Sequence, residues 1–195
     1  MHQKSEAVFE TEKKFRCTEI DKLVDHACSL GFIQTQKNIR EHDIYFTDKE
    51  HIFIEKRICL RIRQTDSHCE ITHKGHSQDT GAFYSKLENN IEIAHENKEN
   101  AISLIESLGF LKYVEIKKVR DIFKKTQEKY TYNIAIDHIE NIGYFIEFEI
   151  LSPKAIEKDQ IKIIFNEFVG HFGGFDLQEE SLPYRDIVKQ EDKIV

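Results

Sequence analysis

The sequence is poor in the residues that make linkers and covalent cross-links. Two prolines and eight glycines among 195 residues leave little room for a flexible linker, so we expect one domain that is long enough to bury a core. The four cysteines, at positions 17, 28, 59 and 69, form no Cys-x-x-Cys pair. This spacing argues against a disulfide framework and against a structural zinc site, and it favours reduced thiols in a cytosolic protein.

Long apolar runs and an excess of positive charge are also missing. Residues 1–6 lack the hydrophobic stretch of a signal peptide. No segment of the sequence approaches the ~20 apolar residues of a membrane span. The formal net charge of −7 argues against a general DNA-binding surface, although it allows a local pocket of positive charge. We therefore expect a cytoplasmic protein with neither a membrane nor a nucleic acid as its partner.

The residues that are present predict a folded chain rich in strands. Hydrophobic residues make up 39% of the sequence, with 14 Phe and 7 Tyr, which favours a packed core. Apolar residues at helical spacing predict helices over 20–30 and 98–108 and a third one that includes 161–168. Alternating patterns predict strands over 9–15, 37–46, 58–63, 70–74, 83–93, 114–124, 130–138 and 144–151. Seven or eight strands with three helices outside indicate an α+β fold with a largely antiparallel sheet.

A short repeat divides the chain into two related halves. The segment Ser29-Leu-Gly-Phe32 recurs as Ser107-Leu-Gly-Phe110, and Asp43-Ile-Tyr recurs as Asp121-Ile-Phe at the same spacing. The repeat predicts that each half consists of a helix followed by an antiparallel run of strands.

The first predicted strand carries an unusual set of charges. Side chains alternate between the two faces of a strand, so Glu10, Glu12 and Lys14 project from one face. Two neighbouring carboxylates suit a hard ion such as Mg²⁺ or Mn²⁺, and a lysine beside them suits a phosphate oxygen. The alternative is an edge strand with a solvated, charge-paired outer face.

Similar charged faces recur along the chain. Other predicted strands carry cations, namely Arg61, Arg63, Lys74, Lys118 and Arg120. The last two predicted strands, 130–138 and 144–151, carry the acids Asp137, Glu147 and Glu149. A sheet that curls into a barrel would bring these faces together in its lumen, with acids to hold a metal and bases to hold phosphate. Periodicity alone leaves open the alternative that every strand simply has one wet face.

Taken in order, these motifs resemble the CYTH group, the triphosphate tunnel enzymes that include class IV adenylyl cyclases and thiamine triphosphatases. The resemblance covers about residues 8–150. It rests on Glu10-x-Glu12-x-Lys14, Leu60-Arg61-Ile62-Arg63, Lys74-Gly75, Lys118-Val119-Arg120, Asp137 and Gly143-Tyr-Phe-Ile-Glu147-Phe-Glu149.

Two segments depart from the pattern of the group. Its Arg-x-Glu-x-Glu strand is replaced by Lys86-Leu-Glu88-Asn-Asn90, and Glu92 is an alternative equivalent of the last acid. Near the C-terminus, Leu182-Pro-Tyr184-Arg-Asp186 is similar to the group's Ser-Tyr-x-Asp segment, with Pro in place of Ser.

The resemblance implies a fold and a set of site residues. The fold would be an eight-stranded antiparallel β-barrel, open as a tunnel, with helices packed outside. One CYTH-like domain would span residues 1–195, with a C-terminal helical segment at about 153–190. The triphosphate would be bound by Lys14, Arg61, Arg63, Lys74, Lys86, Lys118 and Arg120. Mg²⁺ or Mn²⁺ would be bound by Glu10, Glu12, Asp137, Glu147 and Glu149. The catalytic residues would be Glu12, Lys14, Asp137 and Glu147.

The resemblance also implies the reaction, with alternatives. The segment His42–Phe46 looks most similar to class IV adenylyl cyclases, which convert ATP to cyclic AMP and pyrophosphate. The second candidate is a thiamine or inorganic triphosphatase, and the third is a non-catalytic module that binds polyphosphate or a nucleotide. The expected partner is therefore a nucleoside triphosphate or another triphosphate substrate, and a homodimer is an open alternative to a monomer.

Overall fold

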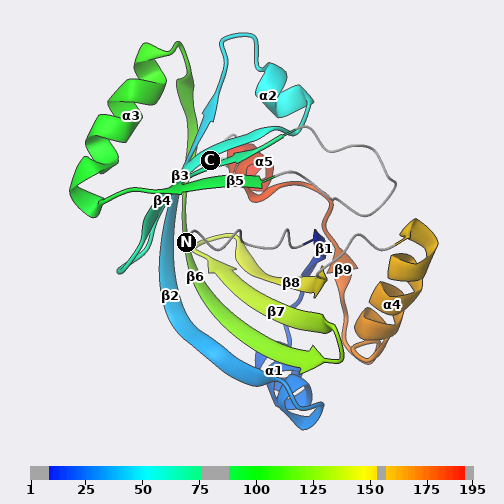
Figure 1. Cartoon of the computed structure of the whole chain (residues 1–195). Coiled ribbons are helices and arrows are strands. Elements are labelled where there is room, and N and C mark those ends of the chain that lie inside the picture. The colour runs from blue at the N-terminus through cyan, green and yellow to red at the C-terminus, as the bar shows by residue number, and fades with distance from the viewer. Residues whose placement is uncertain (1–8, 76–87, 153–156, 192–195) are drawn as a thin grey trace, which may run out of the picture.

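One antiparallel sheet that curls around a central hollow dominates the computed structural model (Figure 1). The structure describes residues 9–75, 88–152 and 157–191. The described strands are β1 (Phe9–Arg16), β2 (Ile33–Thr47), β3 (Cys59–Gln64), β4 (Cys69–Lys74), β5 (Glu88–Glu92), β6 (Leu111–Gln127), β7 (Tyr130–Ile139), β8 (Gly143–Ser152) and β9 (Gln178–Glu179). They confirm the expected antiparallel α+β architecture, with the three predicted helices packed outside the sheet as expected.

The order of the strands shows how far the sheet closes. They follow each other as β5-β4-β3-β2-β6-β7-β8-β1-β9, so among the described residues β5 and β9 are the two free edges. The curl therefore encloses a hollow without hydrogen bonds between its ends in this part of the chain. The two-residue strand β9, which the sequence patterns do not predict, extends the edge next to β1.

The two longest strands, β2 and β6, pair with each other and curve along their length (Figure 1). They pair antiparallel from Ile33 opposite Lys124 to Thr47 opposite Leu111, with shifts of register near Gln36 and Tyr45. Such irregularities add a residue to one strand, and they increase the local twist and bend. The bends in this pair help to turn the sheet into a curved wall.

Two helices cover the outer face of one half of the sheet. These are α1 (Ile20–Ser29) and α4 (Lys158–Gly170). Leu23 of α1 and Phe165 of α4 pack with Phe148 of β8 in one buried cluster. Because alternate residues of a strand face opposite sides, the burial of Phe148 outside directs Glu147 and Glu149 inward.

A third helix covers the outer face of the other half. This helix, α3 (Lys98–Ser107), follows the short 3₁₀ turn η1 (His95–Asn97). Its Ile102 and Ile105 pack with Ile44 of β2 and Ile62 of β3. The burial of Ile62 on the outside turns Arg61 and Arg63 toward the hollow, as the alternating pattern predicted.

The C-terminal helix, α5 (Tyr184–Glu191), packs against the inner face of the sheet (Figure 1). Tyr184 and Ile187 pack with Val114, Ile116 and Phe145, which are inward-facing residues of β6 and β8. Arg185 donates hydrogen bonds to the carbonyls of Ile58, Phe53 and Ile54 and so holds α5 to the short helix α2 (Ile52–Glu55). Helix α5 thus fills one end of the concave face of the sheet. The charged side chains of the sheet lie on the part of this face beside α5.

The internal repeat corresponds to the same structural unit in both halves. Gly31 follows α1 with φ = 87°, and Gly109 follows α3 with φ = 94°. Backbone in this region favours glycine because it has no Cβ. The Phe32 amide donates to the Ala27 carbonyl, and the Phe110 amide donates to the Ile105 carbonyl. The two turns lead directly into β2 and β6, which pair with each other in the sheet.

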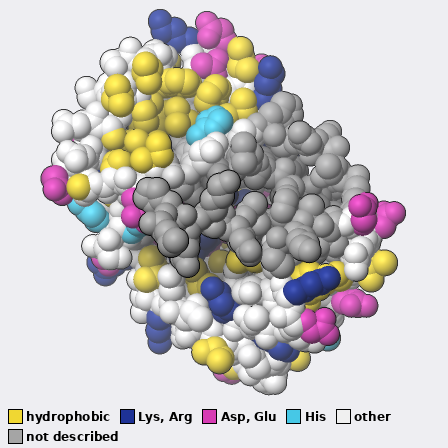
Figure 2. Space-filling model, viewed as in Figure 1, with side chains coloured by type: hydrophobic (Ala, Val, Ile, Leu, Met, Phe, Trp, Pro, Cys, Tyr) yellow, Lys and Arg dark blue, Asp and Glu magenta, His cyan; other side chains and the backbone are white. Residues whose placement is uncertain are grey.

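Hydrophobic side chains gather on the outer surface over α2, α3 and the start of β6 (Figure 2). They include Ile52, Leu104, Leu111 and Leu108, which is 69% exposed. In the described parts of the chain, no helix has the length and apolar character needed to cross a membrane. The expectation of a homodimer stays a prediction.

Candidate active site

A cavity of about 540 Å³ opens on the inner face of the curled sheet. The predicted site residues in its wall combine opposite charges from five strands. The predicted site residues that line it are Glu10, Glu12, Lys14, Arg61, Arg63, Lys74, Lys118, Arg120, Glu147 and Glu149. Lys86 lies outside the described residues.

The acidic part of the wall is formed by β1 and β8. Their register places Glu12 opposite Glu149 and Lys14 opposite Glu147. Burial and the charges of Glu147 and Glu10 raise the pKa of Glu12 to about 7, while Lys74 acts in the opposite direction. Lys74 belongs to β4 and lines the same cavity as Glu12, so β1 and β4, which are far apart in the order of the strands, both face this cavity.

The donor set suits a hard divalent ion. Glu10 and Glu12 lie two residues apart on one strand, close enough for Glu10 to help raise the pKa of Glu12. Within the described ranges, no group of three His, Cys, Asp or Glu side chains is arranged to hold a metal. Mg²⁺ does not need such a group, because proteins often bind it through one or two carboxylates together with substrate phosphates and water. The pair Glu10 and Glu12 fits this mode.

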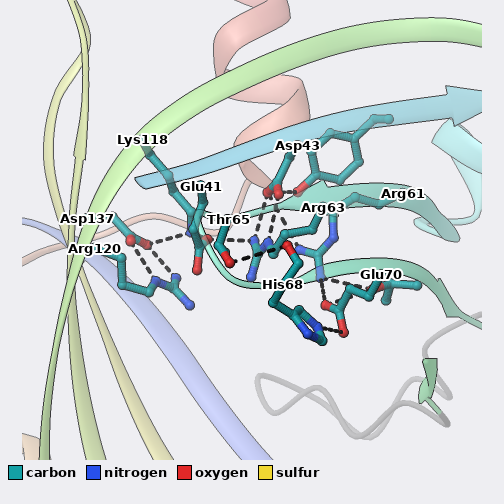
Figure 3. A network of polar contacts seen from close by, with 12 residues as sticks. Glu41, Asp43, Arg61, Arg63, Thr65, His68, Glu70, Lys118, Arg120 and Asp137 are labelled. Carbon is teal, nitrogen blue, oxygen red and sulfur yellow. Dashed lines mark hydrogen bonds and ion pairs between the residues drawn. The ribbon is translucent and has the colours of Figure 1, made fainter. Parts of the chain in front are cut away.

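Most cations of the opposite wall are held by buried acids (Figure 3). Asp43 on β2 accepts two hydrogen bonds of 2.7 Å from Nε and Nη2 of Arg63 on β3. Glu41 lies 2.9 Å from Nη2 of Arg63 and 3.1 Å from Nζ of Lys118. Burial alone would raise the pKa of Asp43, but the charges of Arg61 and Arg63 outweigh it and hold this pKa below its usual value.

Arg61 occupies the middle of this wall. Its Nη2 donates to Thr72 Oγ1 over 3.2 Å, and its Nη1 lies 3.7 Å from Asp43 Oδ2. The side chain is well buried, yet no described residue accepts a hydrogen bond from its Nε. The guanidinium thus keeps donor capacity for an anionic ligand in the cavity.

Asp137 is buried behind the cavity wall. Its oxygens accept hydrogen bonds from Arg120 Nε at 2.7 Å, Arg120 Nη2 at 2.5 Å, Lys118 Nζ at 3.1 Å and the Tyr184 hydroxyl at 2.7 Å. Asp137 is fully buried and is not among the residues that line the cavity. The arrangement suits a positioning role toward Lys118 and Arg120 better than direct binding of a metal.

This chain has known relatives in sequence and in fold. A family model for the CYTH domain matches residues 9–181. The chain belongs to the CYTH domain family. Proteins of this family act on triphosphates and need divalent metal ions.

Relatives of this CYTH domain include a curated protein of Methanocaldococcus jannaschii, named "Putative adenylate cyclase MJ0240". It is 33% identical over 154 residues, which are 79% of this chain and 83% of the relative. Among solved structures, a "putative adenylate cyclase" from Vibrio parahaemolyticus has a TM-score of 0.71 at 20% identity. That match covers 93% of this chain and 98% of the Vibrio chain.

A second solved structure has a different description. It is the Hippeastrum protein HpAC1, described as a "putative adenylyl cyclase" that "reveals a dominant triphophatase activity". Its TM-score is 0.64 at 16% identity, and the match covers 93% of this chain and 96% of the Hippeastrum chain. At these identities the two structural matches establish the shared fold.

Lys14 connects the acidic wall of the CYTH domain to its C-terminal segment. Its Nζ donates a hydrogen bond of 2.5 Å to the Leu182 carbonyl and lies 4.0 Å from the centroid of the Tyr184 ring. Burial lowers the pKa of Lys14, and the charges of Glu147 and Glu12 oppose this shift. The segment that resembles the group's Ser-Tyr-x-Asp motif therefore contacts the cavity directly.

The strand that departs from the family pattern lies at the sheet edge. Register places Asn90 opposite Thr72 and Glu92 opposite Glu70. The side chain of Glu92 is 83% exposed, lies 3.7 Å from His68 Nδ1, and does not line the cavity.

Sequence reasoning missed several residues of the site. Glu41 and Asp43 form ion pairs with Arg63 of the cavity wall. Asn133 lines the cavity beside Glu149. The alternation of Glu41, Asp43 and Tyr45 with apolar Ile44 and Phe46 was the available signal. For Asn133 no signal existed, because one polar residue in an apolar strand has no characteristic spacing.

Proposed function

We propose that this protein is a divalent-metal-dependent adenylate cyclase that converts ATP to cyclic AMP and pyrophosphate. One observation carries the proposal: a single cavity is lined by the carboxylates of β1 and β8 and, from other strands, by five cations besides Lys14. Six cations exceed the roughly four negative charges of a triphosphate, and carboxylates that bind a divalent ion restore the balance. The curated relative named as an adenylate cyclase supports the choice of reaction.

The cations bind and orient the phosphate chain in this proposal. Arg63, Lys118 and Arg120 are each fixed by at least one buried carboxylate. Donors held in place before the substrate arrives lose little entropy on binding, and they need no reorganisation as charge develops. Asp137, Asp43 and Glu41 thus act as positioning residues for the cations.

A bound divalent ion would neutralise phosphate charge and help to align the triphosphate, with Glu10 and Glu12 as its protein ligands. Glu147 and Glu149 complete the acidic wall beside them. In the reaction, the ribose 3′-hydroxyl loses its proton to solvent, its oxygen forms a bond to the α-phosphorus, and the bond from this phosphorus to the pyrophosphate oxygen breaks. Catalysis rests mainly on positioning and electrostatic stabilisation of the phosphoryl charge.

A product analysis tests the proposal. Purified protein is incubated with ATP and either Mg²⁺ or Mn²⁺, and the products are separated by anion-exchange chromatography. The cyclase releases cyclic AMP and pyrophosphate in equal amounts, without ADP. A reaction mixture without a divalent ion, containing EDTA, is the control and should remain unreacted.

A triphosphatase is the second candidate, favoured by the description of the Hippeastrum structure. Water would then attack the terminal phosphorus, and orthophosphate would appear in place of pyrophosphate. Inorganic triphosphate and thiamine triphosphate would be substrates as well. A protein that binds triphosphates and leaves all of them intact would instead support the non-catalytic module.

A further inference from the structure

Asn133, on β7, lines the cavity and carries a buried hydrogen-bond acceptor that no described residue uses. The residue is 9% exposed and lines the cavity wall. Its Nδ2 donates a short hydrogen bond to Glu149 Oε2. Its Oδ1 is buried and accepts no hydrogen bond from any residue that the structure describes. Buried polar atoms in proteins are nearly always satisfied, so an exception inside a cavity calls for a ligand.

The contact with Glu149 fixes which end of the amide is presented. A carboxylate accepts hydrogen bonds and cannot donate when ionised. Turning the amide over would place Oδ1 against the oxygens of Glu149, which is repulsive. Asn133 therefore keeps Oδ1 as its acceptor for a ligand, while one of its two amide N–H donors is used by Glu149.

The surroundings of Asn133 are apolar on the side of the cations. Ala135 is the next inward residue of β7, and the register places Ile122 of β6 opposite it. Both line the cavity. One step further along each strand are Asp137 and Arg120, which are opposite each other. The wall thus runs from cations, through a small apolar patch, to an isolated acceptor.

We propose that Asn133 recognises an exocyclic amine on the organic group of the triphosphate substrate. The inference rests on the proposed function, because the cations are taken to hold the phosphates. With the phosphates there, the attached ring would lie over Ala135 and Ile122, and the acceptor would meet a donor on its edge. The 6-amino group of adenine and the 4-amino group of the thiamine pyrimidine both supply such a donor.

Ligands that carry oxygen in place of the amine provide the test. Inosine triphosphate and oxythiamine triphosphate place an acceptor where ATP and thiamine triphosphate place a donor. Dissociation constants are measured at 4 °C with Ca²⁺ in place of Mg²⁺, and chromatography checks that each ligand stays intact. Inorganic triphosphate, which has no organic group, reports on the cations alone.

The variant Asn133→Leu removes the acceptor at similar volume. Wild type should bind at least one amine ligand about 10- to 100-fold more tightly than its oxygen analogue, and the variant should lose this preference. The pair that shows the preference identifies the source of the amine. Inorganic triphosphate should bind wild type and variant equally. Thr131→Val, two residues along the same strand and outside the cavity lining, should keep the wild-type preference.

Several outcomes would overturn the inference. Equal binding of the amine and oxygen ligands to wild type would do so, even if Asn133→Leu failed to fold. An equal loss of inorganic triphosphate binding in the variant would indicate a structural role. Weaker Mn²⁺ binding by the variant, measured by electron paramagnetic resonance without nucleotide, would make Asn133 a metal ligand. Failure of wild type to bind inorganic triphosphate would instead refute the proposed function itself.

Discussion

The hydroxyl of Tyr184 donates a hydrogen bond of 2.7 Å to Oδ2 of Asp137 and joins the C-terminal helix to β7. Asp137 is the same carboxylate that holds Lys118 and Arg120. The ring of Tyr184 lies 4.0 Å from Lys14 Nζ and 4.8 Å from Lys118 Nζ. One side chain thus contacts both the acidic and the cationic parts of the wall, which couples the seating of α5 to the geometry of the cavity.

Removing this hydroxyl should weaken the fold. Tyr184→Phe keeps the ring and deletes one hydrogen bond to a buried carboxylate, which is typically worth about 1.5–3 kcal/mol. We expect the free energy of unfolding, measured by urea denaturation, to fall by about that amount. Tyr144→Phe is the matched control, since Tyr144 is 43% exposed, and its effect should stay within about 0.5 kcal/mol. Equal effects of the two variants would argue against the contact.

The raised pKa of Glu12 predicts an unusual dependence of stability on pH. The ordinary pKa of a glutamic acid side chain is 4.5, and that of Glu12 in the folded protein is about 7. Between these values the folded state holds a proton that the unfolded state has lost, so the free energy of unfolding falls as pH rises through this window. The loss reaches at most about 3 kcal/mol for one such group. The pKa of Asp43 is held below its usual value, so the ionised Asp43 stabilises the fold at every pH in this window. Its contribution to the free energy of unfolding is lost only at lower pH, where the folded protein takes up a proton on Asp43.

The variant Glu12→Gln isolates this contribution. A neutral side chain removes the titration, so in EDTA the variant should match wild type near pH 4.5. At pH 8 it should be more stable by about 1–3 kcal/mol. Thermal or urea unfolding across pH 4.5–8 measures the difference. A constant difference between the two proteins over this range would show that Glu12 titrates normally.

The acidic wall should be required for activity. Glu12→Gln and Glu147→Gln each remove one of its charges, and we expect the metal-dependent turnover of triphosphate to fall at least about 100-fold in each. Circular dichroism should show an intact fold. Glu115→Gln changes an exposed acid that pairs with His42 outside the cavity, and it should leave turnover unchanged. Wild-type rates in both cavity variants would refute the assignment.

Variants of the two arginines of β3 test whether these side chains bind triphosphate or are only solvated. Arg61→Ala and Arg63→Ala should each weaken the binding of inorganic triphosphate at least tenfold, which corresponds to a lost charge-assisted bond of about 1.5–3 kcal/mol. Arg63→Ala should also destabilise the fold, because it leaves Asp43 buried without its two strongest hydrogen bonds. Isothermal titration measures binding, and exposed Arg40→Ala on β2 is the control. Unchanged affinity would place both arginines outside the site.

Much of the fold followed from alternation along the strands. Phe15, Ile62 and Phe148 are buried on the outer face, and their positions alone predict that Lys14, Arg61 and Glu147 face inward. The repeated Ser-Leu-Gly-Phe segments likewise located two equivalent helix ends, because a left-handed backbone position favours glycine. These features are local, and local patterns are visible in a sequence.

The contacts between distant segments could not be predicted in this way. Asp43 and Arg63 are opposite each other only because β2 and β3 pair in one register, which no periodicity specifies. Asp137 appeared as a metal ligand in the motif, whereas the structure surrounds it with four donors behind the wall. The insertion of α5 into the concave face depends on the shape of the whole sheet. Such features require the assembled fold.

The last prediction separates the cyclase from the triphosphatase. In the cyclase the nucleophile is the ribose 3′-hydroxyl, so 3′-deoxy-ATP should bind through the same cations and yet release no pyrophosphate. Its inhibition constant should lie close to the KM of ATP, because the phosphates supply most of the contacts. A triphosphatase uses water as its nucleophile and does not depend on this hydroxyl. Release of orthophosphate from 3′-deoxy-ATP at the rate seen with ATP would therefore exclude the cyclase and establish hydrolysis, and inorganic triphosphate should then be cleaved by the same site.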